Sequence, residues 1–134
     1  MLLQQRAAGK YHSGGLWTNA CCSHPRVGES NAKAASRRLL EEMGVDCEDL
    51  TELFVAHYRA EVSDDLTENE LVHVFGGTME TGAVAPDYDE VGDWKWMPYD
   101  ELKADVAAHP ERYSVWLQHY LRNHGDAIAD WMKG

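Results

Sequence analysis

The chain has few cysteines, few positive charges and no long apolar runs. Its three cysteines are an odd number without the spacing of a disulfide framework, which argues against a disulfide-stabilised scaffold. Cys21 and Cys22 are adjacent, and neighbours in a strand point to opposite faces, so they are poor partners for each other. A CxxC pair, the usual half of a structural zinc site, is absent as well.

No run of about eighteen apolar residues occurs, so the sequence predicts no membrane span. The beginning of the chain, MLLQQRAAGKYH, is too polar for the apolar core of a secretory signal. We therefore expect a soluble, cytoplasmic protein that has no membrane as a partner.

Positive charge is scarce, with 12 Lys and Arg against 23 Asp and Glu and a net charge of −11. A phosphate backbone needs a cationic surface, so nucleic acid is not expected as a partner. A small anionic ligand is compatible with this charge only if a metal ion or a few well-placed cations bind it.

The 134 residues are enough for one domain with a single core. Apolar and β-branched patterns predict strands over residues 2–7, 16–21, 51–62, 69–80 and 93–97, with an acidic turn at 63–68. After Pro98 the pattern predicts helices over 99–109, 110–124 and 126–132. This order predicts an α+β fold in which helices pack against a mixed β-sheet.

The clearest predicted element is an amphipathic helix over residues 31–43, with Ser30 as its N-cap and Gly44 as its end. Apolar residues recur at three- and four-residue steps, at Ala32, Ala35, Leu39 and Met43. The other face carries Arg37, Arg38, Glu41 and Glu42, which would ordinarily be a solvated face with local ion pairs.

The spacing of this helix also resembles the Nudix box, whose glutamates hold divalent cations against a diphosphate. The matching positions are Glu29, Arg37, Glu41, Glu42 and the pair Gly44-Val45. Two positions differ: Ser23 stands at the leading glycine, and Arg38 stands where a glutamate should follow the arginine. Replacing a carboxylate with a cation removes a metal ligand and adds a phosphate contact, so the hydrolytic site is altered.

Two further groups could carry chemistry. Glu68 and Glu70, at i and i+2, would project from one face of a strand and offer oxygen ligands to a hard cation, unless the strand begins in solvent. His24 follows Cys22 by two residues, so an extended chain would place a thiol beside an imidazole. The alternative for His24 is an ordinary polar residue of a surface loop.

Four motifs in order, WTNACCSHPRVGES, RRLLEEMGV, ENE and WKW, resemble type I isopentenyl diphosphate isomerase, a Nudix-related family. The resemblance runs over essentially the whole chain. It implies one Nudix-like domain over 1–134, with a mixed β-sheet sandwiched by helices. It also implies isomerisation of isopentenyl diphosphate to dimethylallyl diphosphate through a carbocation, in isoprenoid biosynthesis.

The resemblance implies a role for each matching residue. Cys22 and Glu70 would be the catalytic acid/base pair. His24, Glu68 and Glu70 would bind Mn²⁺ or Zn²⁺, and Glu42 with the backbone oxygen of Cys22 would help hold Mg²⁺ on the diphosphate. The substrate contacts would be cations at Arg6, Lys10 and Arg38 on the phosphates, Tyr58 beside the carboxylate, and Trp96 against the developing cation.

Two metal-binding histidines that the family carries upstream of LLQQRA have no counterpart in this chain, and His12 is an uncertain substitute. Two alternatives therefore stay open: a Nudix hydrolase of a nucleoside diphosphate derivative, and an inactive, truncated domain that binds diphosphates. An exposed sheet edge would favour self-association. In the terminal helices, Trp116, Tyr120 and Trp131 are expected to be core or helix-packing residues rather than ligand contacts.

Overall fold

The structure of the chain is a computed structural model that describes residues 1–9, 14–21, 25–47, 49–63, 66–78 and 84–133. Within the segment 58–70 it describes the backbone of the strands and not the side chains. Among the described residues, no helix combines the length and the apolar character needed to cross a bilayer.

The strand β1 (Leu2–Arg6) is the middle of a three-stranded sheet, between β2 (Trp17–Asn19) and β5 (Val91–Trp96). Both pairings are antiparallel. A second sheet is the long antiparallel hairpin of β3 (Thr51–Ser63) and β4 (Leu66–Gly76). One parallel bridge joins Trp17 to Tyr113. The expected α+β fold is confirmed, with the strands divided between two sheets.

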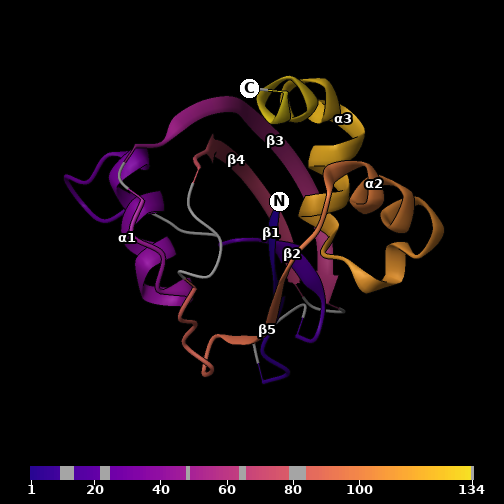
Figure 1. Ribbon diagram of the computed structural model, residues 1–134, viewed down its shortest axis with the longest axis horizontal. Coiled ribbons are helices and arrows are strands. Elements are labelled where there is room, and N and C mark those ends of the chain that lie inside the picture. The colour runs from indigo at the N-terminus through magenta and orange to yellow at the C-terminus, as the bar shows by residue number, and fades with distance from the viewer. Residues whose placement is uncertain (10–13, 22–24, 48, 64–65, 79–83, 134) are drawn as a thin grey trace.

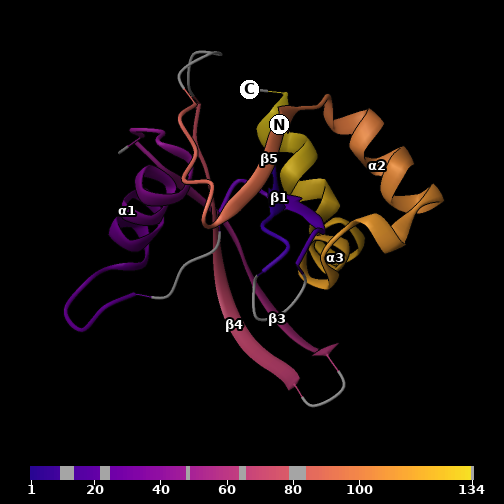
Figure 2. The same ribbon diagram turned by 90° about the horizontal axis from the view of Figure 1, so that it is seen from below.

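Helices lie on both sides of these strands, as the sequence predicts (Figure 1). The helix α1 (Asn31–Met43) lies on one side, and α2 (Tyr99–Ala108) and α3 (Val115–Met132) lie on the other. Figure 2 shows the β3–β4 hairpin extending away from the rest of the molecule between these helical layers. A single 3₁₀ turn, η1 (Pro110–Arg112), joins α2 to α3.

Two apolar clusters hold the layers together. One packs α2 and α3 against the strands around Leu3, Ala56, Leu102, Trp116 and Tyr120, which confirms the expected burial of Trp116 and Tyr120. The other packs α1 against β1 and β5 around Leu2, Met43, Val45, Cys47 and Val91. Leu2 and Leu3 belong to opposite clusters because successive side chains of a strand alternate between its faces.

The ends of the helices follow from local residues. The Ser30 side chain accepts a hydrogen bond from the Lys33 backbone N–H at 3.2 Å and so begins α1. Gly44 ends it in the left-handed conformation, with φ 65°, and donates its N–H to the Leu40 carbonyl at 3.0 Å. In α3 the backbone of His124 leaves the helical region, with φ −131° and ψ 18°, and the helix kinks there.

The predicted elements differ from the observed ones in several places. β4 was expected at 69–80 and runs over Leu66–Gly76, because residues expected in the acidic turn pair with β3 instead. The predicted helices 110–124 and 126–132 are one kinked helix that begins only after the Ser114 N-cap. On α1, Ala32 of the predicted apolar face is exposed, whereas Ala34 and the charged Glu42 are buried. The buried face of α1 therefore differs in part from the one that the sequence predicts.

We predict that Gly44→Ala destabilises the protein more than Gly28→Ala does. Both glycines have positive φ, at 65° and 80°, a conformation that costs an L-residue about 1–2 kcal/mol. Of the two, only Gly44 has a neighbour that the new Cβ would meet, because it would clash with the Ala85 carbonyl oxygen. Nothing lies within 4 Å of a Cβ at Gly28.

Denaturant titration of the two variants measures the difference, with Gly28→Ala as the control for backbone conformation alone. Equal losses of unfolding free energy would contradict the close packing of the loop at Ala85 against the end of α1.

Candidate active site

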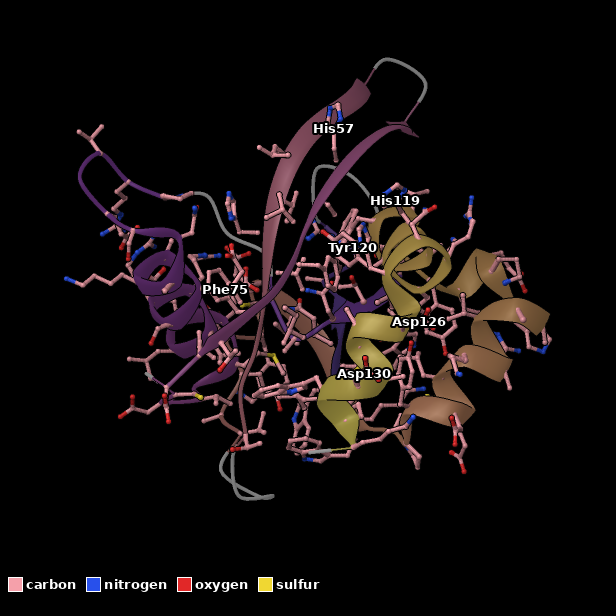
Figure 3. All side chains as sticks on the ribbon, turned by 90° about the horizontal axis from the view of Figure 1, so that it is seen from above. His57, Phe75, His119, Tyr120, Asp126 and Asp130 are labelled. Atoms are coloured by element: carbon pink, nitrogen blue, oxygen red, sulfur yellow. The ribbon has the colours of Figure 1, made fainter. Side chains whose placement is uncertain are left out.

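A cavity of about 980 Å³ opens between α1, the start of β1, β4 and α3. Its charged lining comes mainly from α1 and β1, with Arg6, Arg26, Arg37, Arg38, Glu41 and Glu42. Its aromatic lining is Phe75, Trp96, Trp116, Tyr120 and Trp131. Figure 3 shows Phe75 on the side of α1 and Tyr120 on α3, across the strands from it. The cavity thus has both charged and aromatic walls.

Glu42 is the buried charge of this cavity, with a residue exposure of 6%. One carboxylate oxygen accepts a hydrogen bond from Arg38 Nη2 at 2.6 Å, and the other accepts one from Gln4 Nε2 at 2.9 Å. A carboxylate is stable inside a protein only when it is paired and hydrogen-bonded in this way. The ordinary alternative, a solvated helix face, therefore does not apply to Glu42, because these two partners let it turn inward; its role as a metal ligand stays a prediction.

Arg38 lies beside Glu41 and Glu42, as the sequence predicts. Its Nη1 donates to Glu41 Oε2 at 2.6 Å, and its Nη2 lies 3.9 Å from Glu90 Oε2 in addition to its bond to Glu42. The side chain is 23% exposed. A guanidinium carries five donors, so Arg38 keeps hydrogen-bonding capacity for a ligand in the cavity while it is paired.

Arg37 forms the second ion pair of the helix. It binds Glu29 through two nitrogens, at 2.8 and 3.0 Å, and it reaches Glu41 at 3.1 Å. This pairing with Arg37, together with the backbone N–H of Arg26, lowers the pKa of Glu29 to about 2. The pKa of Glu41 is also lowered, by Arg38 and then Arg37. The carboxylates of Glu29 and Glu41 are thus held in the ionised form.

Arg6 and Trp96 both line the cavity, and their roles towards a substrate stay predictions. The Arg6 guanidinium carbon lies 5.2 Å from the centre of the Trp116 ring, in a cation–π contact. Trp96 is 37% exposed and pairs with Leu2 across the β1–β5 ladder. The strand β1 therefore places a cation, and β5 an aromatic ring, on the same cavity.

The other predicted site residues lie outside the described part of the chain, wholly or in their side chains. Lys10, Cys22 and His24 are not described, and neither is His12. Tyr58, Glu68 and Glu70 are described by their strand register alone, which pairs Tyr58 with Glu70 and Ala60 with Glu68. The structure brings together Arg6, Arg38, Glu42 and Trp96, and the roles of the remaining residues stay predictions.

Sequence reasoning missed Gln4, which bonds Glu42, and Glu90, which lies near Arg38. A signal for Gln4 exists: it stands two residues after Leu2, on the strand face that packs against α1. A glutamine on a buried face indicates a polar partner on the facing element. Glu90 comes from a loop between distant elements and has no such signal.

The charged residues suit a magnesium ion. Mg²⁺ prefers carboxylate, phosphate and water oxygens, and Glu42 and Glu41 supply carboxylates on the cavity wall. A carboxylate has about four lone-pair sites, so Glu42 retains acceptor capacity after its bonds to Arg38 and Gln4. Among the side chains that the structure describes, no group of three or more His, Cys, Asp or Glu is arranged to hold a metal ion.

Known proteins agree with this fold. The sequence matches the NUDIX domain family over residues 1–119. Among solved structures, the MutT protein from Methanosarcina mazei Go1 resembles this chain with a TM-score of 0.60 at 19% identity, covering 77% of this chain and 70% of that one. The fold and the glutamate-bearing helix beside the cavity therefore define a Nudix-domain protein.

Curated relatives narrow the family. Isopentenyl-diphosphate Delta-isomerases 2 and 1 of Aromatoleum aromaticum are 55% and 52% identical over 87% and 88% of this chain. The isopentenyl-diphosphate Delta-isomerase of Cereibacter sphaeroides is 44% identical over 96% of the chain and 73% of its own length. The chain belongs to the isopentenyl-diphosphate Delta-isomerase family. It spans 61% and 66% of the length of the two Aromatoleum relatives.

We predict that Arg37→Met raises the pKa of Glu29 from about 2 towards its ordinary value of 4.5. A carboxylate whose pKa is lowered by folding stabilises the native state above its ordinary pKa, and this contribution is lost as the pH falls. For Glu29 the loss therefore falls between about pH 4.5 and 2 in the native chain, and the variant is expected to lose this dependence.

A carbon-detected NMR titration of the glutamate carboxyls measures this pKa directly. Arg112→Met, on η1 in the opposite helical layer, is the control that should leave Glu29 unchanged. Titration of Glu29 near pH 2 in Arg37→Met would contradict the assigned cause.

Proposed function

We propose that this chain isomerises isopentenyl diphosphate to dimethylallyl diphosphate, the activity named for its relatives. The observation that carries the proposal is the position of Arg38, which replaces the glutamate of the Nudix box and lies on the wall of the cavity against Glu42. A guanidinium there favours holding a diphosphate, and the missing carboxylate disfavours the metal-assisted attack of water that a hydrolase needs.

The charged end of the cavity supports binding of the diphosphate. Arg38 and Arg6 both line the cavity, and we assign them, with Lys10, to the phosphate oxygens. Charge-assisted bonds from arginine to phosphate are geometrically specific because the guanidinium is planar and offers paired donors. They also supply the local positive charge that a chain of net charge −11 lacks overall.

The aromatic walls support binding and chemistry of the five-carbon group. Isomerisation adds a proton to the terminal alkene carbon and removes one from the carbon beside the phosphate-bearing carbon. The cation between these steps is tertiary, and an aromatic face such as Trp96 stabilises a dry cation by about 2 kcal/mol. The cavity must also exclude water, which would otherwise capture the cation as an alcohol.

We assign the proton transfers to Cys22 and Glu70, with Tyr58 as a hydrogen-bonding partner of the carboxylate. A thiol and a carboxyl on opposite sides of the alkene can add and remove protons without a further reactant. In the strand register, the backbone pairs Tyr58 with Glu70, so the two positions lie opposite each other on β3 and β4.

Two metal ions complete the proposal. We assign Mg²⁺ to Glu42 and the backbone oxygen of Cys22, and Mn²⁺ or Zn²⁺ to His24, Glu68 and Glu70. Bound there, the first ion would neutralise diphosphate charge and the second would raise the acidity of its carboxyl ligand. A nitrogen and oxygen ligand set suits Mn²⁺ or Zn²⁺, as an all-oxygen set suits Mg²⁺.

The two alternatives predict different outcomes from isomerisation. A Nudix hydrolase is favoured by the fold it shares with the MutT protein and by the retained Glu41 and Glu42. A domain that only binds diphosphates needs the charged end of the cavity and no proton transfer.

A cytoplasmic location and self-association through a sheet edge stay predictions from the sequence. Light scattering tests the self-association.

We predict that the chain, supplied with Mg²⁺ and Mn²⁺, converts isopentenyl diphosphate in heavy water to dimethylallyl diphosphate that carries deuterium. Proton NMR follows the product, and Cys22→Ala should abolish it. Release of free phosphate would instead identify a hydrolase. Absence of any product, with diphosphate binding retained by calorimetry, would leave a binding domain and overturn the proposed activity.

We also predict that Arg38→Lys raises the substrate KM by about tenfold, because an ammonium cannot reproduce the paired donors of a guanidinium. Lys33→Gln is the matched control: it removes a cation from the same helix, at an exposed position outside the cavity, and should leave KM within about twofold. Circular dichroism checks that both variants fold. A KM for Arg38→Lys equal to that of the unmodified chain would show that Arg38 does not contact the diphosphate.

A further inference from the structure

Gln4 connects two parts of the site through one amide group. Its Nε2 donates to Glu42 Oε2 at 2.9 Å and to the Ala20 carbonyl oxygen at 2.5 Å. Glu42 lies on α1, and Ala20 directly precedes the two adjacent cysteines. Gln4 lies in the middle strand β1 and is only 3% exposed. One buried side chain therefore connects α1, which carries the Nudix-box residues, to the backbone just before Cys21 and Cys22.

The chemistry of the amide makes this connection specific. An amide nitrogen has two donor hydrogens, and both are used here, one on a carboxylate and one on a peptide carbonyl. Neither a carboxylate nor an apolar side chain of similar size could satisfy both acceptors. Loss of the amide would leave Glu42 with Arg38 as its remaining described partner inside the protein.

Gln4 differs from Arg38 in what else it can bind. Arg38 is 23% exposed and lines the cavity, so a phosphate there can use the donors that Glu41 and Glu42 leave unused. Gln4 is buried and does not line the cavity, so its bond to Glu42 is not shared with a ligand. Gln4 is therefore the partner that holds the Glu42 carboxylate from the protein side, while Arg38 faces the ligand.

We propose that Gln4 is a positioning residue: it fixes the Glu42 carboxylate relative to the Ala20 peptide and thereby sets the affinity of the site for a divalent cation with diphosphate. This inference rests on the proposed function in one respect: it takes the charged end of the cavity as the place where the divalent cation and the diphosphate bind.

The next residue of the strand is a matched control. Gln5 donates its amide to the Gly15 carbonyl at 3.0 Å in an exposed hydrogen bond, on the opposite face of β1. Gln4→Met and Gln5→Met both replace an amide with an apolar side chain of similar length. Gln4→Met removes the hydrogen bonds to Glu42 and Ala20, whereas Gln5→Met removes the bond to Gly15.

The experiment measures Mn²⁺ and inorganic diphosphate binding to the whole chain, by electron paramagnetic resonance of free Mn²⁺. Gln4→Met should weaken binding at least tenfold, whereas Gln5→Met should remain within twofold of the unmodified chain. Thermal unfolding identifies the temperature range in which each variant is folded, and binding is measured there. Equal affinities in the two variants, or no binding by the unmodified chain, would overturn the proposal.

A double-mutant cycle separates positioning from general loss of structure. If Gln4 acts through Glu42, Gln4→Met should have little further effect on Mn²⁺ affinity in a Glu42→Gln background. Additive effects would assign Gln4 a structural role only. Because this readout is binding, a chain that binds as expected but makes no dimethylallyl diphosphate would refute the proposed function and leave the role of Gln4 intact.

Discussion

Burying the carboxylate of Glu42 is the constraint on which the rest of the site depends. An unpaired charge in a protein interior costs several kcal/mol, so the fold must bring partners to it. The partners come from two elements: Arg38 from the preceding turn of α1, and Gln4 from β1. To meet Gln4, α1 must pack against the face of β1 that carries Leu2, which is where the second apolar cluster forms. The polar contact and the apolar packing therefore require the same arrangement.

The same arrangement explains how an acidic chain presents an anion site. The chain carries a net charge of −11, yet arginines gather at one end of the cavity. The guanidinium groups of Arg37 and Arg38 are held there by ion pairs with Glu29, Glu41 and Glu42. Because each carboxylate has more acceptor sites and each guanidinium more donors than these pairs use, the network can accommodate both a cation and a phosphate.

Features determined by neighbouring residues could be predicted from the sequence. α1 was predicted over 31–43 and runs over Asn31–Met43, because Ser30 and Gly44 cap its two ends locally. The contacts of Arg38 with Glu41 and Glu42 followed from helical spacing in the same way. Features that depend on distant residues could not be predicted. The partner that holds Glu42 inward, Gln4, is 38 residues away, and the start of β4 is set by its pairing with β3 rather than by its polar sequence.

The C-terminal helix shows how the aromatic side of the cavity depends on distant packing. The Ser114 hydroxyl caps α3 and lies 2.8 Å from the hydroxyl of Thr18 in β2, so the helix begins at a fixed point of the first sheet. Two residues later, Trp116 packs beneath the Arg6 guanidinium. Further along, the helix kinks at His124, whose ring stacks on Phe54 of β3 at 4.3 Å.

After the kink, Trp131 packs directly on Gly76, where a side chain on β4 would leave only 2.7 Å to the indole. One helix therefore contacts both sheets and contributes tryptophans to the cavity near each of them. The expectation of packing roles is confirmed: Trp116 and Tyr120 are buried, and Trp131 packs on Gly76, although all three also line the cavity. Some residues of α3 therefore both pack in the apolar core and line the cavity, because the helix lies between the two.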